Sequence, residues 1–339
     1  MEKLPDNTAL LYSELLQQCA ASLPVDKGIS YITKTVGGKV YWYLELVVGK
    51  QKRQVSLGRD SEDLRTQIEA QKTLVKQSEE NTENRQRLVA MLTKGGVANP
   101  SSTEARVLEV LERAGVFLAG GVLIGSHAFS LYGNLLGMQW SGATMRTQDM
   151  DVACSHIPVG ISRQDTPLIE VLKNAGMGFF EVPALDRKAP STMYKIYGQE
   201  FHVDMLTPLH GAPNKHPVYL SHIKAYADPL RFLDYLLEDT LPAVVVAKAG
   251  IIVNVPDPSR FALHKLVVSV RRSAREHNKA IKDIKQAQQL LTVLINERPG
   301  EVMLAIDAAK KMPKKFIEQL CEGLTQLENK QQEYLLGHI

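Results

Sequence analysis

The alternation of apolar and polar positions near the start of the chain predicts a small sheet beside a long helix. Residues 29–57 contain three apolar or aromatic runs, separated by two-residue hairpin turns at 37–38 and 49–50. We therefore expect a three-stranded antiparallel meander here. A short amphipathic helix is predicted before it, over residues 8–20, and a long polar helix after it, from about residue 61 to 92.

A stretch rich in Gly, Pro and Ser at residues 94–102 predicts the main domain boundary. Beyond it, strand-like and helical patterns alternate up to residue 256, and every pattern from residue 259 onward is helical. The predicted strands and hairpins cover residues 116–124, 149–153, 192–206 and 243–255, and a loop is expected over 137–147. The predicted helices cover residues 103–114, 126–136, 166–175, 229–237, 259–272, 276–296, 300–311 and 314–335.

This order of elements predicts an α+β protein with three parts. Residues 103–256 are expected to form the core, a mixed sheet with flanking helices. Residues 257–339 are expected to form a helical C-terminal domain. Residues 1–95 would add the N-terminal helix, the meander and the long connecting helix.

Composition excludes several classes of protein without identifying one. The chain has 339 residues, of which 44% are hydrophobic, and a net charge of +3, so it can bury a core and has no strong bias toward one partner. No apolar run approaches the roughly 18 residues that a membrane helix needs, and the first ten residues lack the layout of a signal peptide. Three widely separated cysteines are typical of a reducing compartment. We expect a cytoplasmic protein without membrane contact.

The basic residues are concentrated in two segments. Residues 34–59 contain six Lys or Arg against one acidic residue, and residues 260–285 contain eight against two. In the predicted meander, Tyr41 and Tyr43 share one face with nearby basic residues, a combination that suits nucleic-acid binding by stacking and charge. The alternative, which such weak compositional signals favour, is a small sheet that packs on a neighbour or mediates a homo-oligomer.

Three short motifs in the predicted core carry candidate chemistry. Gly125-Ser126 lies at the predicted start of a helix, where free N–H groups favour phosphate. Asp149 and Asp151 lie two residues apart on a predicted strand, so their side chains project from the same face. Asp204 lies among apolar residues of a later predicted strand, where a carboxylate is unfavourable unless it binds a partner. A hard divalent cation, Mg2+ or Mn2+, is the usual partner of such neighbouring carboxylates.

The Gly-rich run 120–125 does not fit the other common nucleotide-binding loops. It lacks the G-x-G-x-x-G spacing of dinucleotide-binding folds, and no suitable acidic residue follows at about twenty residues. It also lacks the Gly-Lys-Ser/Thr sequence of a P-loop.

In their order these motifs resemble the nucleotidyltransferase fold of the DNA polymerase β superfamily, whose pattern is h-G-[GS], then [DE]-h-[DE], then h-[DE]-h. The corresponding residues are Ile124-Gly125-Ser126, Asp149-Met150-Asp151 and Val203-Asp204-Met205. The sequences at 125–129, 146–151 and 258–266 further resemble an uncharacterised bacterial group that looks like a relative of abortive-infection and toxin-type nucleotidyltransferases. The resemblance covers roughly residues 103–295.

The resemblance implies transfer of a nucleoside monophosphate from an NTP to a hydroxyl group. The catalytic and metal-binding residues would be Asp149, Asp151 and Asp204. The nucleotide-binding residues would be Gly125, Ser126, Arg146, Lys265 and Arg271. RNA, such as the 3′ end of a tRNA, is the first candidate for the acceptor, and a protein side chain is the second. The competing interpretation is a non-catalytic scaffold that binds nucleotide, nucleic acid or a partner chain.

One departure from the family pattern concerns the segment between the first two motifs. Twenty-two residues separate Ser126 from Asp149, more than in the minimal members of the superfamily. We therefore expect the loop over 137–147, which carries Trp140, to shape the substrate pocket.

Overall fold

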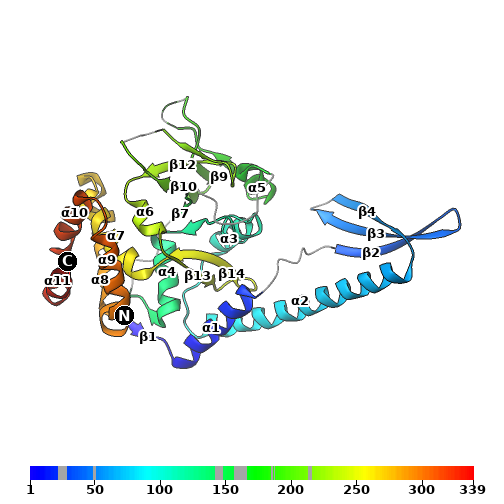
Figure 1. Ribbon diagram of the computed structural model, residues 1–339, viewed down its shortest axis with the longest axis horizontal. Helices are drawn as coiled ribbons and strands as arrows, with labels where there is room; N and C mark the ends of the chain where they lie inside the picture. The colour runs from blue at the N-terminus through cyan, green and yellow to red at the C-terminus, as the bar shows by residue number, and fades with distance from the viewer. Residues whose placement is uncertain are drawn as a thin grey trace.

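A mixed seven-stranded sheet forms the centre of the structure, with helices beside it and a long arm extending from one side (Figure 1). The structure is a computed structural model. It describes residues 1–21, 29–48, 51–141, 148–155, 166–184, 186, 188–212 and 216–339. The predicted fold class, a mixed sheet flanked by helices, is confirmed.

The central sheet has the strand order β11-β12-β10-β7-β5, and β9 and β8 continue it from β10. Strands β7 and β10 run parallel, whereas β5 is antiparallel to β7. The predicted hairpin over 192–206 is confirmed as the antiparallel pair β9 and β10. The strands are β5 (Val122–Leu123), β7 (Asp149–Ala153), β8 (Phe179–Glu181), β9 (Met193–Ile196), β10 (His202–Pro208), β11 (Val218–Leu220) and β12 (Ala225–Leu230).

The helices of the body surround this sheet, and no helix among the described residues is long and apolar enough to cross a membrane. They are α1 (Asp6–Ala20), α3 (Ser102–Arg113), α4 (Gly125–Leu136), α5 (Leu168–Asn174), α6 (Leu233–Leu237), α7 (Pro258–Arg271), α8 (His277–Glu297), α9 (Pro299–Ala309), α10 (Lys314–Leu324) and α11 (Asn329–Leu336). Two short pairs complete the body: β1 (Glu2–Lys3) with β6 (Met138–Gln139), and β13 (Thr240–Val245) with β14 (Ile251–Pro256).

The central sheet has one apolar face and one polar face, because side chains alternate along each strand. Met150 and Val203 are fully buried in an apolar cluster that also contains Leu108 of α3 and Leu172 of α5. The intervening positions of the same strands carry the polar side chains. The sequence pattern therefore predicted both the strands and the face that is buried.

Helix α7 joins the sheet to the C-terminal helices. Its residues Phe261, Leu263 and Leu266 are buried in the main apolar cluster. Helix α10 approaches α7 so closely that a Cβ on Gly323 would touch the main chain of Leu266. The C-terminal helices are thus packed directly against the element that follows the sheet.

The N-terminal helix α1 packs on the body, although the sequence grouped it with the meander. Tyr12 and Leu15 are buried in a second apolar cluster, together with Leu92 of α2 and Val244 of β13. The Tyr12 hydroxyl donates a hydrogen bond to the Val244 carbonyl (3.0 Å) and accepts one from the Val244 N–H (3.1 Å). The predicted domain boundary near residue 95 stays a prediction, but α1 contacts the core.

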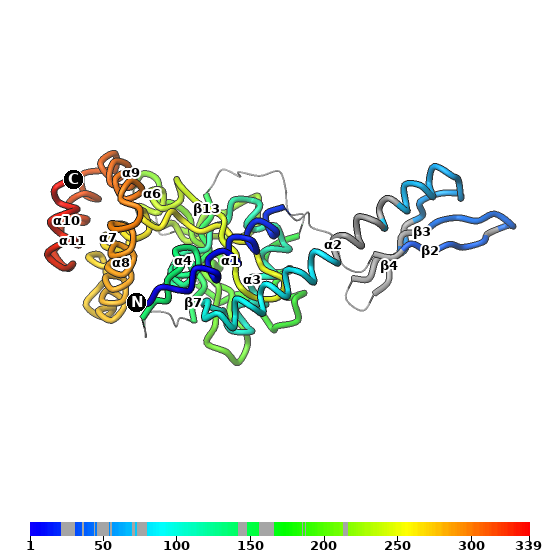
Figure 2. The backbone as a smooth tube through the Cα atoms, turned by 90° about the horizontal axis from the view of Figure 1, so that it is seen from below, coloured from blue at the N-terminus to red at the C-terminus, as the bar shows by residue number. Residues whose placement is uncertain are grey.

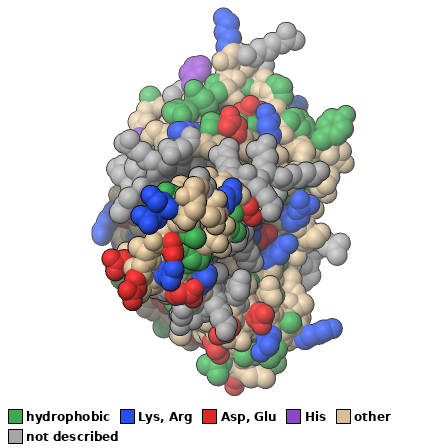
Figure 3. All heavy atoms as spheres, turned by 90° about the vertical axis from the view of Figure 1, so that its right-hand side faces the viewer, with side chains coloured by type: hydrophobic (Ala, Val, Ile, Leu, Met, Phe, Trp, Pro, Cys, Tyr) green, Lys and Arg blue, Asp and Glu red, His purple; other side chains and the backbone are tan. Residues whose placement is uncertain are grey.

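The arm consists of α2 (Glu62–Lys94) and the predicted meander, β2 (Ile29–Val36), β3 (Lys39–Val48) and β4 (Gln51–Arg59) (Figure 2). One face of the sheet lies toward α2, because Trp42 Nε1 donates a hydrogen bond to Asp60 (2.8 Å) and Lys72 of α2 lies over the Trp42 ring. On the other face Lys34 lies over Tyr43. Among the described side chains in Figure 3, basic and acidic residues are interspersed at this end of the molecule.

Three predictions about elements were wrong. The predicted strand over 116–124 is reduced to Val122–Leu123, because the chain turns through 114–120, where Gly120 has a left-handed φ of 93° and Asn254 Nδ2 binds the carbonyls of Phe117 and Gly121. The predicted helix over 229–237 begins later, since β12 continues to Leu230. The predicted helix over 314–335 is two helices, α10 and α11.

The double hydrogen bond of Tyr12 provides a test of how α1 is anchored. Tyr12→Phe leaves the buried N–H and carbonyl of Val244 without this partner, so we expect the free energy of unfolding to fall by about 1–3 kcal/mol. Urea denaturation measures the change. The control Leu10→Ala removes an exposed side chain of the same helix and should change stability little; an equal effect of both variants would contradict the anchoring role of Tyr12.

Candidate functional site

Three carboxylates lie together on the polar face of the central sheet. Asp149 and Asp151 are on β7, and the parallel register places Asp204 of β10 directly beside Asp151. We call these three residues the acidic cluster. Asp151 is the most deeply placed of them, whereas the Asp149 and Asp204 side chains keep 35% and 23% of their exposed area. Two strands that are distant in sequence thus form one anionic patch.

Helix α4 begins directly against the acidic cluster. Gly125 has a left-handed φ of 67°, and a Cβ at this position would collide with the carboxylate of Asp151. The Ile124 N–H donates a hydrogen bond to the Asp151 carbonyl (3.0 Å), which fixes the turn against β7. Glycine is therefore required twice here, by the backbone conformation and by the approach of the carboxylate.

The acidic cluster is electrostatically costly. Burial raises the pKa of Asp151, and the charge of Asp149 adds to this effect while Lys265 opposes it. Burial, together with the negative charge of the neighbouring Asp151, raises the pKa of Asp204 to about 6. Desolvated carboxylates at this spacing favour either a proton or a cation between them.

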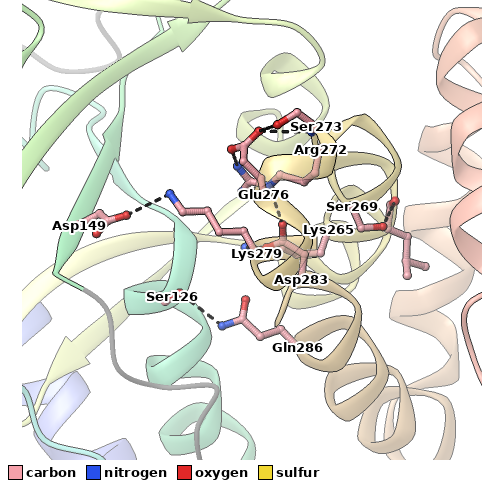
Figure 4. A network of polar contacts seen from close by, with 11 residues as sticks. Ser126, Asp149, Lys265, Ser269, Arg272, Ser273, Glu276, Lys279, Asp283 and Gln286 are labelled. Atoms are coloured by element: carbon pink, nitrogen blue, oxygen red, sulfur yellow. Dashed lines mark hydrogen bonds and ion pairs between the residues drawn. The ribbon is translucent and has the colours of Figure 1, made fainter. Parts of the chain in front are cut away.

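Helix α8 faces the acidic cluster with a stripe of polar residues (Figure 4). Lys279 Nζ lies 3.6 Å from Asp149 Oδ2, and Gln286 Nε2 donates a weak hydrogen bond to the Ser126 hydroxyl (3.4 Å). Lys279, Lys282 and Gln286 are spaced by about one helical turn each, so they lie along one side of α8. This helix of the C-terminal part contacts both the acidic cluster and the start of α4.

A buried ionic network holds α8, which carries Lys279, Lys282 and Gln286, in place. Asp283 of α8, whose side chain is 4% exposed, binds Lys265 Nζ (2.5 Å) and Arg272 Nε (3.1 Å). Arg272 also contacts Glu276 (3.1 Å). Because Asp283 holds a lysine and an arginine from the α7 region, the network fixes the position of α8 relative to α7 (Figure 4).

A cleft of about 1120 Å³ opens beside Asp149. We call it the central cleft. Its wall is formed by residues of α3, α4 and α8 and by the segments that precede β7 and β10, among them Glu104, Ser126, His127, Gln148, Phe201, Lys279 and Lys282. Burial lowers the pKa of Lys282, and the positive charge of Lys265 adds to this effect. The cleft thus has an acidic edge and a basic wall, and its volume suits a nucleotide.

The structure brings together five of the residues that the sequence singled out: Gly125, Ser126, Asp149, Asp151 and Asp204. Lys265 forms no ion pair with these residues in the described structure, but forms one with Asp283 of α8. Arg271 does not line the central cleft, since its guanidinium lies over the Phe232 ring and contacts Gln319 of α10. Arg146 lies outside the described residues.

The expectation that the loop over 137–147 shapes the substrate pocket stays a prediction, but Trp140 itself does not line the central cleft. Trp140 is 5% exposed, donates a hydrogen bond from Nε1 to the Phe129 carbonyl (2.8 Å) and stacks on the Phe129 ring. It therefore belongs to the core and not to a substrate pocket. The remainder of the loop, residues 142–147, lies outside the described residues.

Sequence reasoning missed Lys279, Lys282 and Gln286 as site residues. The two lysines belong to the basic segment 260–285, but charge counting does not say which of its members face the core. A helical projection of the predicted helix 276–296 places all three on one side, and this was the available signal. Their proximity to Asp149 and Ser126 depends on how α8 packs.

The donor set of the acidic cluster fits a hard divalent cation. Carboxylate oxygens are the ligands that Mg2+ prefers, and a cation would offset both the burial and the mutual repulsion that raise the pKa of Asp151 and Asp204. Among the described residues, no three His, Cys, Asp or Glu side chains are already grouped as the ligands of one ion. Side-chain rotation of Asp149 away from Lys279, and of Asp204 away from His202, is needed to converge on one point.

Comparison with known proteins gives one match. A family model described as a nucleotidyltransferase matches residues 102–310, which is more than half of the chain and includes the acidic cluster, α4 and α8. No curated protein and no solved structure matches the chain.

The raised pKa of Asp204 makes a prediction about stability. A carboxyl whose pKa rises from 3.8 to about 6 on folding binds its proton more tightly in the folded state. Its contribution to stability is therefore lost as pH rises through that interval. In metal-free buffer at pH 8, Asp204→Asn should raise the free energy of unfolding by roughly 1–3 kcal/mol, and the gain should vanish near pH 4.

Urea denaturation at both pH values measures this difference. The control Asp307→Asn alters an exposed carboxylate of α9 and should leave stability nearly unchanged at both. A less stable Asp204→Asn variant at pH 8 would contradict the electrostatic account.

Proposed function

Because the chain belongs to the nucleotidyltransferase family, we propose that it transfers a nucleoside monophosphate from an NTP to an acceptor hydroxyl and releases pyrophosphate. The observation that carries the proposal is the position of the acidic cluster, which lies on two adjacent parallel strands and against the glycine that opens α4. Membership of the family supports the general reaction. The roles of individual residues below are inferred from their geometry.

Asp149, Asp151 and Asp204 would hold the divalent cation, Mg2+ or Mn2+. When bound, such an ion neutralises phosphate charge and favours the ionised form of its carboxylate ligands. The paired strands fix the spacing of the three backbone positions, and rotation of the Asp149 and Asp204 side chains would complete the set of ligands. Gly125 allows the closest approach of Asp151 to the start of α4.

The triphosphate would lie between the start of α4 and the basic wall of the central cleft. The first N–H groups of a 12-residue helix and the Ser126 hydroxyl favour an anion at this end. Lys279 and Lys282 of α8 line the same cleft and supply positive charge from the opposite side. Lys265 holds α8, and with it these two lysines, in position through its ion pair with Asp283. Roles for Arg146 and Arg271 in binding the NTP stay predictions.

The acceptor hydroxyl needs a group that takes its proton as it attacks the α-phosphorus. Asp204 suits this role, because burial and neighbouring charges raise its pKa to about 6. In the proposed reaction the acceptor O–H bond breaks toward the Asp204 carboxylate and a new O–P bond forms. The bond from the α-phosphorus to the bridging oxygen breaks, and pyrophosphate leaves with the electron pair.

RNA, for example the 3′ end of a tRNA, remains our first candidate for the acceptor, and a protein hydroxyl is the second. The meander would contribute either a nucleic-acid contact, through the face with Tyr41, Tyr43 and Lys34, or a homo-oligomer interface. A cytoplasmic location, a bacterial origin and a toxin-like role also stay predictions.

The alternative is a non-catalytic scaffold that binds a nucleotide, a nucleic acid or a partner chain. The electrostatic cost of the acidic cluster favours catalysis. Burial works against ionisation of Asp151 and Asp204, and a scaffold gains nothing from such a cost. Replacement of either carboxylate by a neutral residue would remove it.

The catalytic proposal is tested by incubating the full chain with each α-labelled NTP, Mg2+ or Mn2+, and total RNA or protein. We expect labelled acceptor from the wild type, and a decrease in rate of roughly 100-fold or more for Asp151→Asn, because the variant lacks a negatively charged metal ligand. Asp307→Asn is the matched control and should retain the wild-type rate.

An absence of label from every NTP and acceptor would contradict the catalytic proposal. If NTP binding were then the same in the wild type and in Asp151→Asn, the scaffold interpretation would replace it.

The basic wall of the central cleft gives a separate prediction about the NTP. Lys282→Ala removes a charge-assisted contact to phosphate, so the KM for the NTP should rise roughly 10- to 100-fold. Steady-state kinetics with varied NTP measures the change. Lys285→Ala, at an exposed position of the same helix, is the control, and an equal change in both variants would contradict a specific role for Lys282.

A further inference from the structure

The polar face of the sheet continues beyond Asp204, away from the central cleft. Strand β12 lies beside β10 with Leu206 in register with Asp228. Because alternate residues share a face, Tyr226 and Asp228 project on the same side as Asp204. Asp228 is close enough that its charge contributes to the raised pKa of Asp204. We call this surface of β12 and β11 the acceptor face.

Two tyrosine rings are exposed on the acceptor face. Tyr226 and its cross-strand partner Tyr219 of β11 are 38% and 50% exposed, and their ring centroids are 5.1 Å apart. Beside Tyr226 lies a hollow of about 500 Å³, whose lining includes Pro190, His216 and Pro217. Exposed flat rings next to an open hollow suit the stacking of an unpaired base.

Two arginines lie at the far end of the same strand. Arg231 follows β12 directly. Burial lowers the pKa of Arg271 at the end of α7, and the nearby positive charge of Arg231 adds to this effect. Their contacts are the Gly211 carbonyl for Arg231, and the Gln319 side chain and the Phe232 ring for Arg271. Neither forms an ion pair with an acidic side chain in the described part of the chain. Neighbouring guanidinium groups without a carboxylate suit a phosphate.

The acceptor face and the central cleft lie on opposite sides of the acidic cluster. The cleft adjoins Asp149 of β7 and the residue that precedes β10, Phe201. Strand β12 instead borders β10 on the side opposite β7, and the parallel register brings its residue Tyr226 level with Asp204. An attacking hydroxyl and a departing pyrophosphate occupy opposite sides of the reacting phosphorus. If the NTP binds in the central cleft, the second substrate therefore reaches the reacting phosphorus from the acceptor face.

We propose that the acceptor face binds the unpaired 3′ end of an RNA, with a base stacked on Tyr226 and a backbone phosphate held by Arg231 and Arg271. The five residue steps from Tyr226 to Arg231, which follows the end of β12, span about 16 Å, which suits a segment of a few nucleotides. The terminal ribose hydroxyl then lies at Asp204. This assignment rests on the proposed function and names the substrate of the same site.

A protein acceptor fits this surface less well. A peptide commonly adds to the edge of a sheet through its main chain, whereas the exposed groups here are rings and guanidinium groups on a sheet face and at the end of a strand. A protein hydroxyl also brings no phosphate to Arg231 and Arg271. The chemistry of the acceptor face therefore matches a phosphate-bearing strand.

The experiment measures binding of a fluorescent, short single-stranded oligoribonucleotide to the full chain by anisotropy at several salt concentrations. Tyr226→Ala should weaken binding about fivefold or more, and Tyr226→Phe should retain it, because the ring alone supports stacking. Arg231→Gln should weaken binding and lower the salt dependence by roughly 0.7 in the logarithmic slope for one lost phosphate contact. The thermal midpoint of each variant checks that it is folded.

The controls are Tyr197→Ala and Arg113→Gln, which remove an exposed ring and an exposed guanidinium elsewhere, and both should bind RNA as the wild type does. In the transfer assay, Tyr226→Ala should raise the KM for RNA and leave the KM for the NTP unchanged. RNA binding that is insensitive to Tyr226→Ala and Arg231→Gln would overturn the proposal, as would preferential labelling of a DNA strand of the same sequence.

Failure of this proposal and failure of the proposed function give different results. If the wild type labels a protein and Tyr226→Ala does not change the rate, the transferase activity stands and the RNA acceptor face is overturned. If the wild type labels nothing but binds RNA through Tyr226 and Arg231, the proposed activity fails and the acceptor face is supported as an RNA site.

Discussion

The repulsion among three carboxylates on one sheet face is the constraint on which the rest of the site depends. Asp149, Asp151 and Asp204 are held side by side by the parallel pairing of β7 and β10, so their backbone positions cannot move apart without breaking the sheet. Positive groups must therefore surround them. Lys279 contacts Asp149 directly, and the charge of Lys265 acts on Asp151.

Helix α8 connects this constraint to the C-terminal part of the chain. One side of the helix carries Lys279, Lys282 and Gln286 toward the core, and Asp283 anchors the helix to Lys265 and Arg272. Breaking a buried pair such as Lys265 and Asp283 leaves an uncompensated charge, which costs far more than loss of an exposed ion pair. The basic wall of the central cleft therefore has a fixed position relative to the acidic cluster.

The polar face of the sheet presents two surfaces, one on each side of the acidic cluster. Toward the first residues of β7 and β10 it opens into the central cleft, where helix α4 and the lysines of α8 favour phosphate. Across β10 it carries the exposed tyrosine rings of β11 and β12, and two neighbouring guanidinium groups lie where β12 ends. The acidic cluster lies between these two surfaces, as the proposed transfer from an NTP to a second substrate requires.

The sequence by itself determined the local elements and the three acidic residues. Strict alternation predicted β7, β10 and the meander, and helical periodicity predicted α3, α4 and α8, because these patterns reflect which side of each element is buried. Periodicity failed where glycines bend the chain, as at 114–120. It also could not place Trp140, whose side chain is recruited into the core by Phe129.

Only the tertiary structure decided which cations and rings face the acidic cluster. The basic segment 260–285 contains eight Lys or Arg, but the packing of α8 selects Lys279 and Lys282 for the central cleft and turns Arg271 toward Phe232. Likewise, the register between β10 and β12 places Tyr226 on the face of Asp204. Such contacts join residues that are far apart in the chain, and local patterns carry no information about them.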